Sequence, residues 1–216
     1  MPRTLLLDLD GTLADTLPDL AASLNRLMRA RGLPAFAPAE VAPMVGDGVA
    51  RLVQRAFVAR GQEADAAAIA EYSADYAAHA ADATQAFPGV AEGLRSMAEE
   101  GWRLAVCTNK PERAARSLLA ALGLADYFAA IGGGDSFPVR KPDPAHLLAT
   151  LKAAGGEVRG AVMTGDHAND VAAARGAGIP CIFAAWGYGR REMAADADAI
   201  AHDFSEMVRM ARRLAG

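Results

Sequence analysis

The sequence predicts an α/β protein in which one parallel β-sheet carries an insertion made of helices. Within residues 87–216, short apolar runs that are typical of strands alternate with segments of helical periodicity. Residues 15–86 show helical periodicity and no strand pattern, although a strand-like run precedes them. This first run is expected to join the later ones in one sheet, so residues 15–86 are predicted to be an inserted helical cap.

The first strand is the apolar run Leu5-Leu6-Leu7, which ends at two aspartates, Asp8 and Asp10, and then a glycine. Glycine tolerates a sharp bend, which would bring both carboxylates towards one pocket. In the insertion, helices are expected at residues 16–31, after Gly46-Asp47-Gly48, and at about residues 63–83.

The rest of the chain supplies the remaining strands and helices. Strands are expected at residues 103–107, 129–131, 160–164 and 179–183, and helices at residues 90–100, 112–122, 145–154, after Asp170 and at 204–214, beyond a polar linker. Such an alternation predicts a Rossmann-like, doubly wound parallel sheet with helices on both faces. Residues 1–14 and 87–216 would form this core.

The amino-acid composition restricts the functional classes to which the protein can belong. Of the 216 residues, 52% are hydrophobic and 22% charged, which is typical of a globular protein. The net charge of −4 argues against a nucleic-acid or anionic-membrane surface. No signal peptide or membrane span is recognisable, so a cytoplasmic protein is expected, either a monomer or a homodimer. Cys107 and Cys181 lie in apolar runs and are predicted to be unpaired core thiols.

Polar residues collect where the predicted strands end. They are Asp8 and Asp10, then Thr108, Asn109 and Lys110, then Lys141, and finally Asp166 and Asp170. Ligands bind outside the carboxyl ends of the strands in an open parallel sheet. Carboxylates, a hydroxyl group and a scarce lysine at this edge suit a phosphate group together with a hard divalent cation such as Mg²⁺.

Each motif alone also fits a purely structural role. Thr108 and Asn109 are suited to cap the next helix, and Asp143 to cap the helix after Lys141. Asp166 and Asp170 are acidic residues at a helix start, which the helix dipole favours. Asp8 and Asp10 alone would also fit a strand that ends in a polar turn. Four such motifs in order, all at strand ends, favour a functional site.

The chain resembles the phosphatases of the haloacid dehalogenase superfamily, with the closest likeness to phosphoglycolate phosphatases. The resemblance extends over essentially the whole chain and is carried by seven stretches, which are Asp8-Leu-Asp-Gly-Thr-Leu-Ala-Asp-Thr, Val45-Gly-Asp-Gly-Val, Phe87-Pro-Gly-Val, Thr108-Asn-Lys-Pro, Gly133-Gly-Asp-Ser-Phe-Pro, Lys141-Pro-Asp-Pro and Gly165-Asp-His-Ala-Asn-Asp-Val.

The resemblance implies a role for each core residue. Asp8 would attack phosphorus, and Asp10 would protonate the leaving alkoxide and later deprotonate water. Thr108 and Lys141 would hold the phosphoryl oxygens, and Asn109 is predicted to contact the substrate. Mg²⁺ would be bound by Asp8, Asp166 and the Asp10 carbonyl, with Asp170 supporting the metal or Lys141.

The superfamily also contains dehalogenases, phosphonatases and β-phosphoglucomutases. The presence of Asp10 argues against a dehalogenase, and the lack of lysine in the insertion argues against a phosphonatase. The absence of histidine from residues 15–20 weakens the case for a β-phosphoglucomutase. A phosphatase for a sugar phosphate or for many small phosphomonoesters stays open, and a non-catalytic phosphate-binding protein is disfavoured because the catalytic set is complete.

Phosphoglycolate would also need a contact for its carboxylate. The backbone N–H groups at Gly46 and Gly48, together with Arg51, are the predicted contact. The alternative is that Arg51 and Arg55 form a solvated helix face, and the sequence does not choose between the two.

Overall fold

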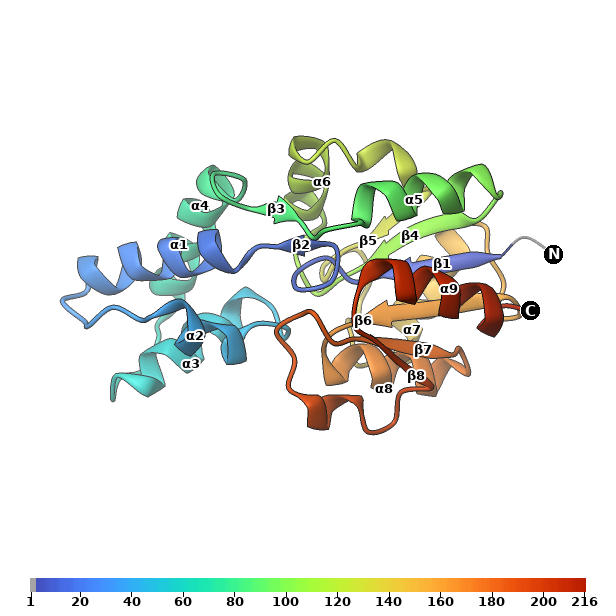
Figure 1. Cartoon of the computed structure of the whole chain (residues 1–216). Helices are drawn as coiled ribbons and strands as arrows, with labels where there is room; N and C mark the ends of the chain where they lie inside the picture. Colours follow the sequence, from blue (N-terminus) through green and yellow to red (C-terminus); the bar gives the residue numbers. More distant parts are fainter. Residues whose placement is uncertain (1–2) are drawn as a thin grey trace.

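A computed structural model describes residues 3–216 and contains a six-stranded sheet (Figure 1). Its strands are β1 (Thr4–Leu7), β4 (Arg103–Cys107), β5 (Ala130–Gly132), β6 (Ala161–Gly165), β7 (Cys181–Ala184) and β8 (Ala199–Ala201). The spatial order is β5-β4-β1-β6-β7-β8, and every neighbouring pair is parallel. The predicted doubly wound α/β fold is confirmed, with β1 at the centre of the sheet.

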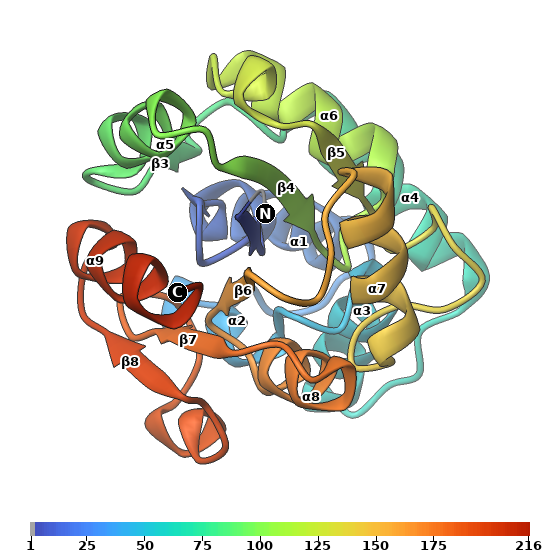
Figure 2. The ribbon, with the colours of Figure 1, turned by 90° about the vertical axis from the view of Figure 1, so that its right-hand side faces the viewer.

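Helices cover both faces of this sheet (Figure 2). They are α5 (Val90–Glu99), α6 (Glu112–Ala121), α7 (Pro144–Ala153), α8 (Ala168–Ala177) and α9 (Phe204–Leu214). Alternate residues of a strand face opposite sides, so Leu5 and Leu7 pack in one cluster with α5 and α9. Leu6 points the other way and packs with α7 and α8.

The sixth strand, β8, was not expected, because the segment before α9 was predicted to be a polar linker. Only three residues of it pair, and Ile200 is partly exposed at the sheet edge. A short edge strand of this kind lacks the apolar run that identifies the inner strands.

The insertion contains α1 (Leu17–Ala30), α2 (Pro38–Val41), α3 (Val49–Ala59) and α4 (Ala66–His79), with a 3₁₀ turn at Ala42–Met44. These helices bury an apolar cluster of their own, formed by residues such as Leu24, Val53 and Tyr72. They lie beyond the carboxyl ends of the strands, at the left of Figure 1.

The expectation that residues 15–86 hold no strand was wrong. The chain enters and leaves the insertion through two short strands, β2 (Ala14–Asp15) and β3 (Gln85–Ala86), which pair antiparallel. Two residues are too few to show the alternation that predicts a strand. The buried carboxylate of Asp19 accepts hydrogen bonds from the N–H groups of Ala83 and Thr84, which ties the returning segment to α1.

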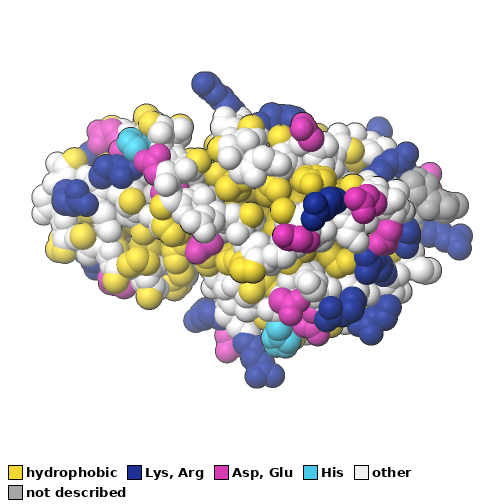
Figure 3. Space-filling view, turned by 45° about the horizontal axis from the view of Figure 1, so that its top comes forward, with side chains coloured by type: hydrophobic (Ala, Val, Ile, Leu, Met, Phe, Trp, Pro, Cys, Tyr) yellow, Lys and Arg dark blue, Asp and Glu magenta, His cyan; other side chains and the backbone are white. Residues whose placement is uncertain are grey.

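On the surface, basic and acidic side chains are interspersed over the sheet-bearing part of the face in Figure 3. None of the helices in residues 3–216 is long and apolar enough to cross a membrane. Cys107 and Cys181 are buried and unpaired, as predicted.

Candidate active site

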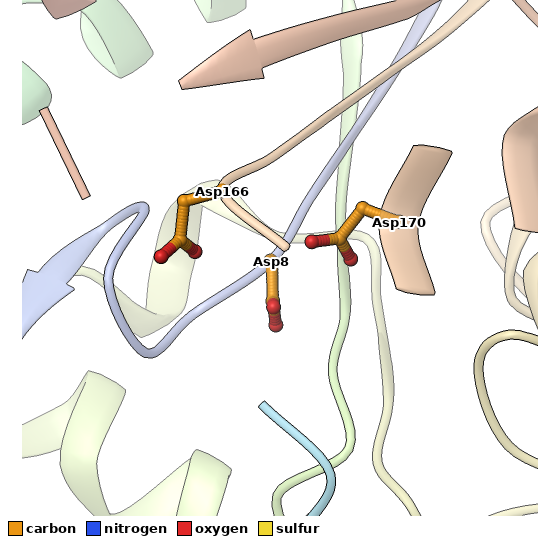
Figure 4. Close-up of side chains that lie close together, drawn as sticks. All are labelled: Asp8, Asp166 and Asp170. Atoms are coloured by element: carbon orange, nitrogen blue, oxygen red, sulfur yellow. The ribbon is translucent and has the colours of Figure 1, made fainter. Parts of the chain in front are cut away.

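Three aspartates meet at the carboxyl ends of the central strands (Figure 4). Asp8 follows β1, Asp166 follows β6, and Asp170 lies in the first turn of α8. Strands β1 and β6 are parallel neighbours with Leu7 opposite Thr164, so both end at the same level. Each of the three carboxylates offers an oxygen within 4.8 Å of the others, and all three residues are buried.

Two glycines make this close approach possible. A Cβ atom at Gly11 would overlap with the carboxylate of Asp166, and the positive φ of Gly11 (82°) suits glycine. At Gly165, a Cβ atom would overlap with the carboxylate of Asp170. Gly11 and Gly165 therefore leave room for the carboxylates to approach one another, and Gly11 also bends the chain.

Lys141 supplies positive charge beside two of the aspartates. Its Nζ lies 2.5 Å from Oδ1 of Asp170 and 3.1 Å from Oδ1 of Asp8. Burial acts to lower the pKa of Lys141, but the carboxylates of Asp170 and Asp8 outweigh it and raise the pKa. Lys141 is therefore a fixed cation next to Asp8.

One ammonium group does not balance three buried carboxylates. Burial raises the pKa of Asp8 to about 6, although Lys141 opposes the shift. Burial and the nearby charge of Asp8 raise the pKa of Asp166 to about 8. An all-oxygen, negatively charged donor set of this kind fits a hard divalent cation. Asp8 and Asp166 would hold it, with Asp170 beside them.

Asp166 is held by residues from two other segments. Its Oδ1 accepts a hydrogen bond from the hydroxyl of Thr12 at 3.0 Å, and its Oδ2 accepts one from the N–H of Tyr188 at 2.8 Å. The Tyr188 hydroxyl also accepts bonds from the N–H groups of Thr16 and Leu17, where α1 begins. Sequence reasoning missed Tyr188, because a lone tyrosine in a loop carries no motif.

The residues after β4 line the same pocket. The hydroxyl oxygen of Thr108 accepts a hydrogen bond from the N–H of Lys110, which leaves the hydroxyl proton for another acceptor. Nδ2 of Asn109 donates to the carbonyls of Gly46 and Lys141, both at 3.0 Å. Asn109 thus connects the insertion to the Lys141 loop, and its predicted contact with substrate stays a prediction.

Asp10 lies close to a second lysine that the sequence analysis placed at a strand end without giving it a role. Nζ of Lys110 is 2.9 Å from Oδ1 of Asp10 and 2.7 Å from the hydroxyl of Tyr76, on α4. The earlier signals were the scarcity of lysine in this chain and the place of Lys110 in the stretch Thr108-Asn-Lys-Pro.

The insertion faces this pocket with the loop that joins the 3₁₀ turn to α3. Gly46 and Gly48 line the pocket, and the Gly46 carbonyl accepts hydrogen bonds from Asn109 and Asn169. Nδ2 of Asn169 also donates to Oδ1 of Asp47 at 2.7 Å. The loop is therefore docked against residues that follow β4 and β6.

The structure does not bring Arg51 to the pocket. Helix α3 turns Leu52 and Val53 inward, which leaves Arg51 exposed with a 3.4 Å bond from its Nη1 to Oε1 of Gln54. The proposed carboxylate contact at Arg51 stays a prediction that this geometry does not favour. Arg55 is also exposed, and it bonds to Asp47.

Comparisons with known proteins identify the family of the chain. The family model described as haloacid dehalogenase-like hydrolase matches residues 5–184. A phosphoglycolate phosphatase of Rhodospirillum rubrum is 42% identical over an alignment of 216 positions, which covers 96% of this chain and 90% of the relative.

Solved structures show the same fold. A predicted phosphoglycolate phosphatase from Haemophilus somnus superposes with a TM-score of 0.90 at 29% identity, covering 97% of both chains. CbbY from Rhodobacter sphaeroides, solved in complex with phosphate, gives a TM-score of 0.81 at 27% identity, covering 96% of both chains. The predictions of family and enzyme class are confirmed, and the chain belongs to the haloacid dehalogenase-like hydrolases as a phosphoglycolate phosphatase-like phosphoric monoester hydrolase.

Proposed function

We propose that the protein hydrolyses 2-phosphoglycolate to glycolate and phosphate, with Mg²⁺ and through an aspartyl-phosphate intermediate. The observation that carries this mechanism is the position of Asp8. Its buried carboxylate lines the pocket and lies 3.1 Å from the ammonium of Lys141. The substrate rests on the names of the relatives, which include the phosphoglycolate phosphatase of Rhodospirillum rubrum.

In the first step, an oxygen of Asp8 forms a bond to phosphorus while the bond from phosphorus to the ester oxygen breaks. The leaving alkoxide takes a proton from Asp10. The hydroxyl of Thr108 and the ammonium of Lys141 stabilise the phosphoryl oxygens as their charge redistributes. Lys141 can do so from its present position, because Asp170 holds its Nζ at 2.5 Å.

In the second step, water gives its proton to Asp10 and its oxygen attacks the phosphorus of the aspartyl phosphate. The bond between phosphorus and the Asp8 oxygen breaks, which releases phosphate and restores the carboxylate. The divalent cation, when bound by Asp8, Asp166 and the Asp10 carbonyl, reduces the repulsion between a carboxylate nucleophile and a phosphate dianion.

Residues 15–86 would act as the cap over this site, and residues 1–14 and 87–216 as the catalytic core. In support, α1–α4 have their own apolar cluster, and residues of their loops and helices line the pocket beside Asp8. A closed cap excludes water and selects small substrates. The N–H groups at Gly46 and Gly48 are the candidate contacts for a substrate carboxylate.

A sugar phosphate is the second candidate substrate class. A point mutant of CbbY, which shares this fold, was solved in complex with xylulose-(1,5)-bisphosphate and is 26% identical to this chain. A cytoplasmic location and a monomeric or homodimeric state also stay predictions.

The test is phosphate release from 2-phosphoglycolate, sugar phosphates, nucleotides and p-nitrophenyl phosphate, each with Mg²⁺ and with excess chelator. We expect the highest kcat/KM for 2-phosphoglycolate and loss of activity with chelator. A maximum on a sugar phosphate would keep the mechanism and reject the substrate. No release from any ester by folded protein would reject the enzymatic proposal.

A further inference from the structure

The second lysine of the site, Lys110, is placed to act on Asp10. Its side chain is only 3% exposed, and its Nζ is 2.9 Å and 3.3 Å from the two oxygens of Asp10. Within residues 3–216, the Asp10 carboxylate accepts hydrogen bonds from no other side chain. The orientation of this carboxylate therefore depends on Lys110.

The position of Lys110 depends in turn on the inserted helices. Its Nζ donates to the hydroxyl of Tyr76 at 2.7 Å and lies 4.4 Å from the centre of the Tyr76 ring. Tyr76 belongs to α4, whereas Asp10 and Lys110 lie in the loops that follow β1 and β4. The ammonium has both of its partners only when α4 lies over these loops. Burying a lysine costs free energy unless it is fully paired, so this contact favours one cap position.

We propose that Lys110 is a positioning residue that aims the Asp10 carboxyl group at the leaving oxygen, and that Tyr76 makes this arrangement depend on the cap. This inference rests on the proposed role of Asp10 as general acid. Lys141 cannot orient Asp10 in the same way, because its ammonium is paired with Asp8 and Asp170.

The role has a specific kinetic signature. An alkoxide leaves slowly unless it receives a proton, whereas p-nitrophenolate is stable as an anion and leaves without one. Loss of Asp10 orientation should therefore impair hydrolysis of alkyl phosphates and largely spare p-nitrophenyl phosphate. The parameter kcat/KM reports this difference, because it covers the steps up to formation of the aspartyl phosphate.

The first experiment compares Lys110→Met with wild type on 2-phosphoglycolate, ethyl phosphate and p-nitrophenyl phosphate. We expect kcat/KM to fall about 10²-fold for both alkyl esters and less than about 3-fold for p-nitrophenyl phosphate. Lys152→Met, which removes an exposed lysine from α7, is the matched control and should leave all three values unchanged. In an Asp10→Asn background, Lys110→Met should add little further loss, because the group that it orients is already absent.

Two outcomes would overturn the proposal. An equal loss on all three esters would mean that Lys110 supports the pocket in general. A loss confined to 2-phosphoglycolate, with ethyl phosphate unaffected, would mean that Lys110 binds the substrate carboxylate directly. An inactive wild-type enzyme, or an active Asp8→Asn variant, would instead reject the proposed mechanism, so the two failures are distinguishable.

The second experiment tests the contribution of the cap. Tyr76→Phe keeps the ring over the ammonium and removes only the hydroxyl, so we expect the same selective loss at about 10-fold. Tyr72→Phe is the matched control on the same helix, because the Tyr72 hydroxyl bonds to the Leu20 carbonyl and not to Lys110. If both variants behave alike, the link through Tyr76 is wrong.

Discussion

The two sides of the pocket are built in different ways. On the sheet side, Asp8, Lys141, Asp166 and Asp170 are buried where the strands β1 and β6, the β5–α7 loop and the start of α8 meet. On the insertion side, the loop around Gly46 is held by side-chain amides that donate to one carbonyl and one carboxylate. The first set can hold reacting groups in place, and the second can be broken and remade as substrate enters and product leaves.

The two sides of the pocket also differ in their effect on the stability of the folded state. The sheet side concentrates like charges whose burial raises the pKa of Asp8 to about 6 and that of Asp166 to about 8. Ionised carboxylates in this position weaken the folded state, so these aspartates are maintained at a cost in stability. The insertion side contains ordinary hydrogen bonds between partly buried groups, and their loss should affect substrate binding more than chemistry.

The largest effect is expected from Asp8→Asn. It removes the proposed nucleophile, so kcat/KM for every ester should fall by more than about 10⁴-fold. The same change removes a buried negative charge, so the melting temperature measured without metal should stay equal or rise. Phosphate release and thermal unfolding would be measured on one preparation. Substantial activity on any ester would contradict Asp8 as nucleophile, and a lower melting temperature would contradict the charge argument.

The second largest effect is expected from metal binding, measured as a change in melting temperature. Asp8 and Asp166 have folded pKa values of about 6 and about 8, above their ordinary value of 3.8, so the folded state binds more protons than the unfolded state. Without metal, their contribution to stability therefore falls as pH rises through those values. A cation binds the ionised form, so the rise in melting temperature on adding Mg²⁺ should grow between about pH 6 and about pH 8.

Thermal unfolding with and without Mg²⁺ at both pH values measures this effect. Asp166→Asn is the test variant, since it removes one predicted ligand without changing the size of the side chain. Its melting temperature should respond little to Mg²⁺ at either pH. A stabilisation that is equal at both pH values, or that persists in Asp166→Asn, would place the cation elsewhere.

On the insertion side, we expect Asn169→Ala to raise KM about 10-fold and to lower kcat less than about 3-fold, because it removes the bonds to Gly46 and Asp47 that dock the loop. Asn25→Ala is the matched control. Asn25 bonds to the backbone of Phe36 within the insertion, so its loss should lower the melting temperature without changing KM. A large fall in kcat for Asn169→Ala would place Asn169 in the chemical step.

The contrast between the two sides also explains what could be predicted from the sequence. Asp8 and Asp166 directly follow apolar strands, and parallel strands end at a common edge, so strand prediction was enough to bring these two together. Lys141, in the loop between β5 and α7, and Asp170, in the first turn of α8, were found from the motifs that contain them. Lys110 and Tyr76 meet only because α4 crosses over that edge, and no pattern in the sequence encodes this crossing. The strands β2 and β3 were missed because two residues carry no periodic signal, and β8 was missed because alternating alanine and aspartate precede it, which leaves no apolar run.

The smallest effect is expected from Arg51→Ala. Arg51 is exposed on α3, so its removal should change KM for 2-phosphoglycolate less than about 2-fold. Arg55→Ala, on the same helix, should raise KM more, because Arg55 bonds to Asp47 and to the Met44 carbonyl and so supports the docked loop. Both would be measured on 2-phosphoglycolate and ethyl phosphate. A rise in KM for Arg51→Ala on 2-phosphoglycolate alone would show that Arg51 contacts the carboxylate, and α3 would then have to turn when substrate binds.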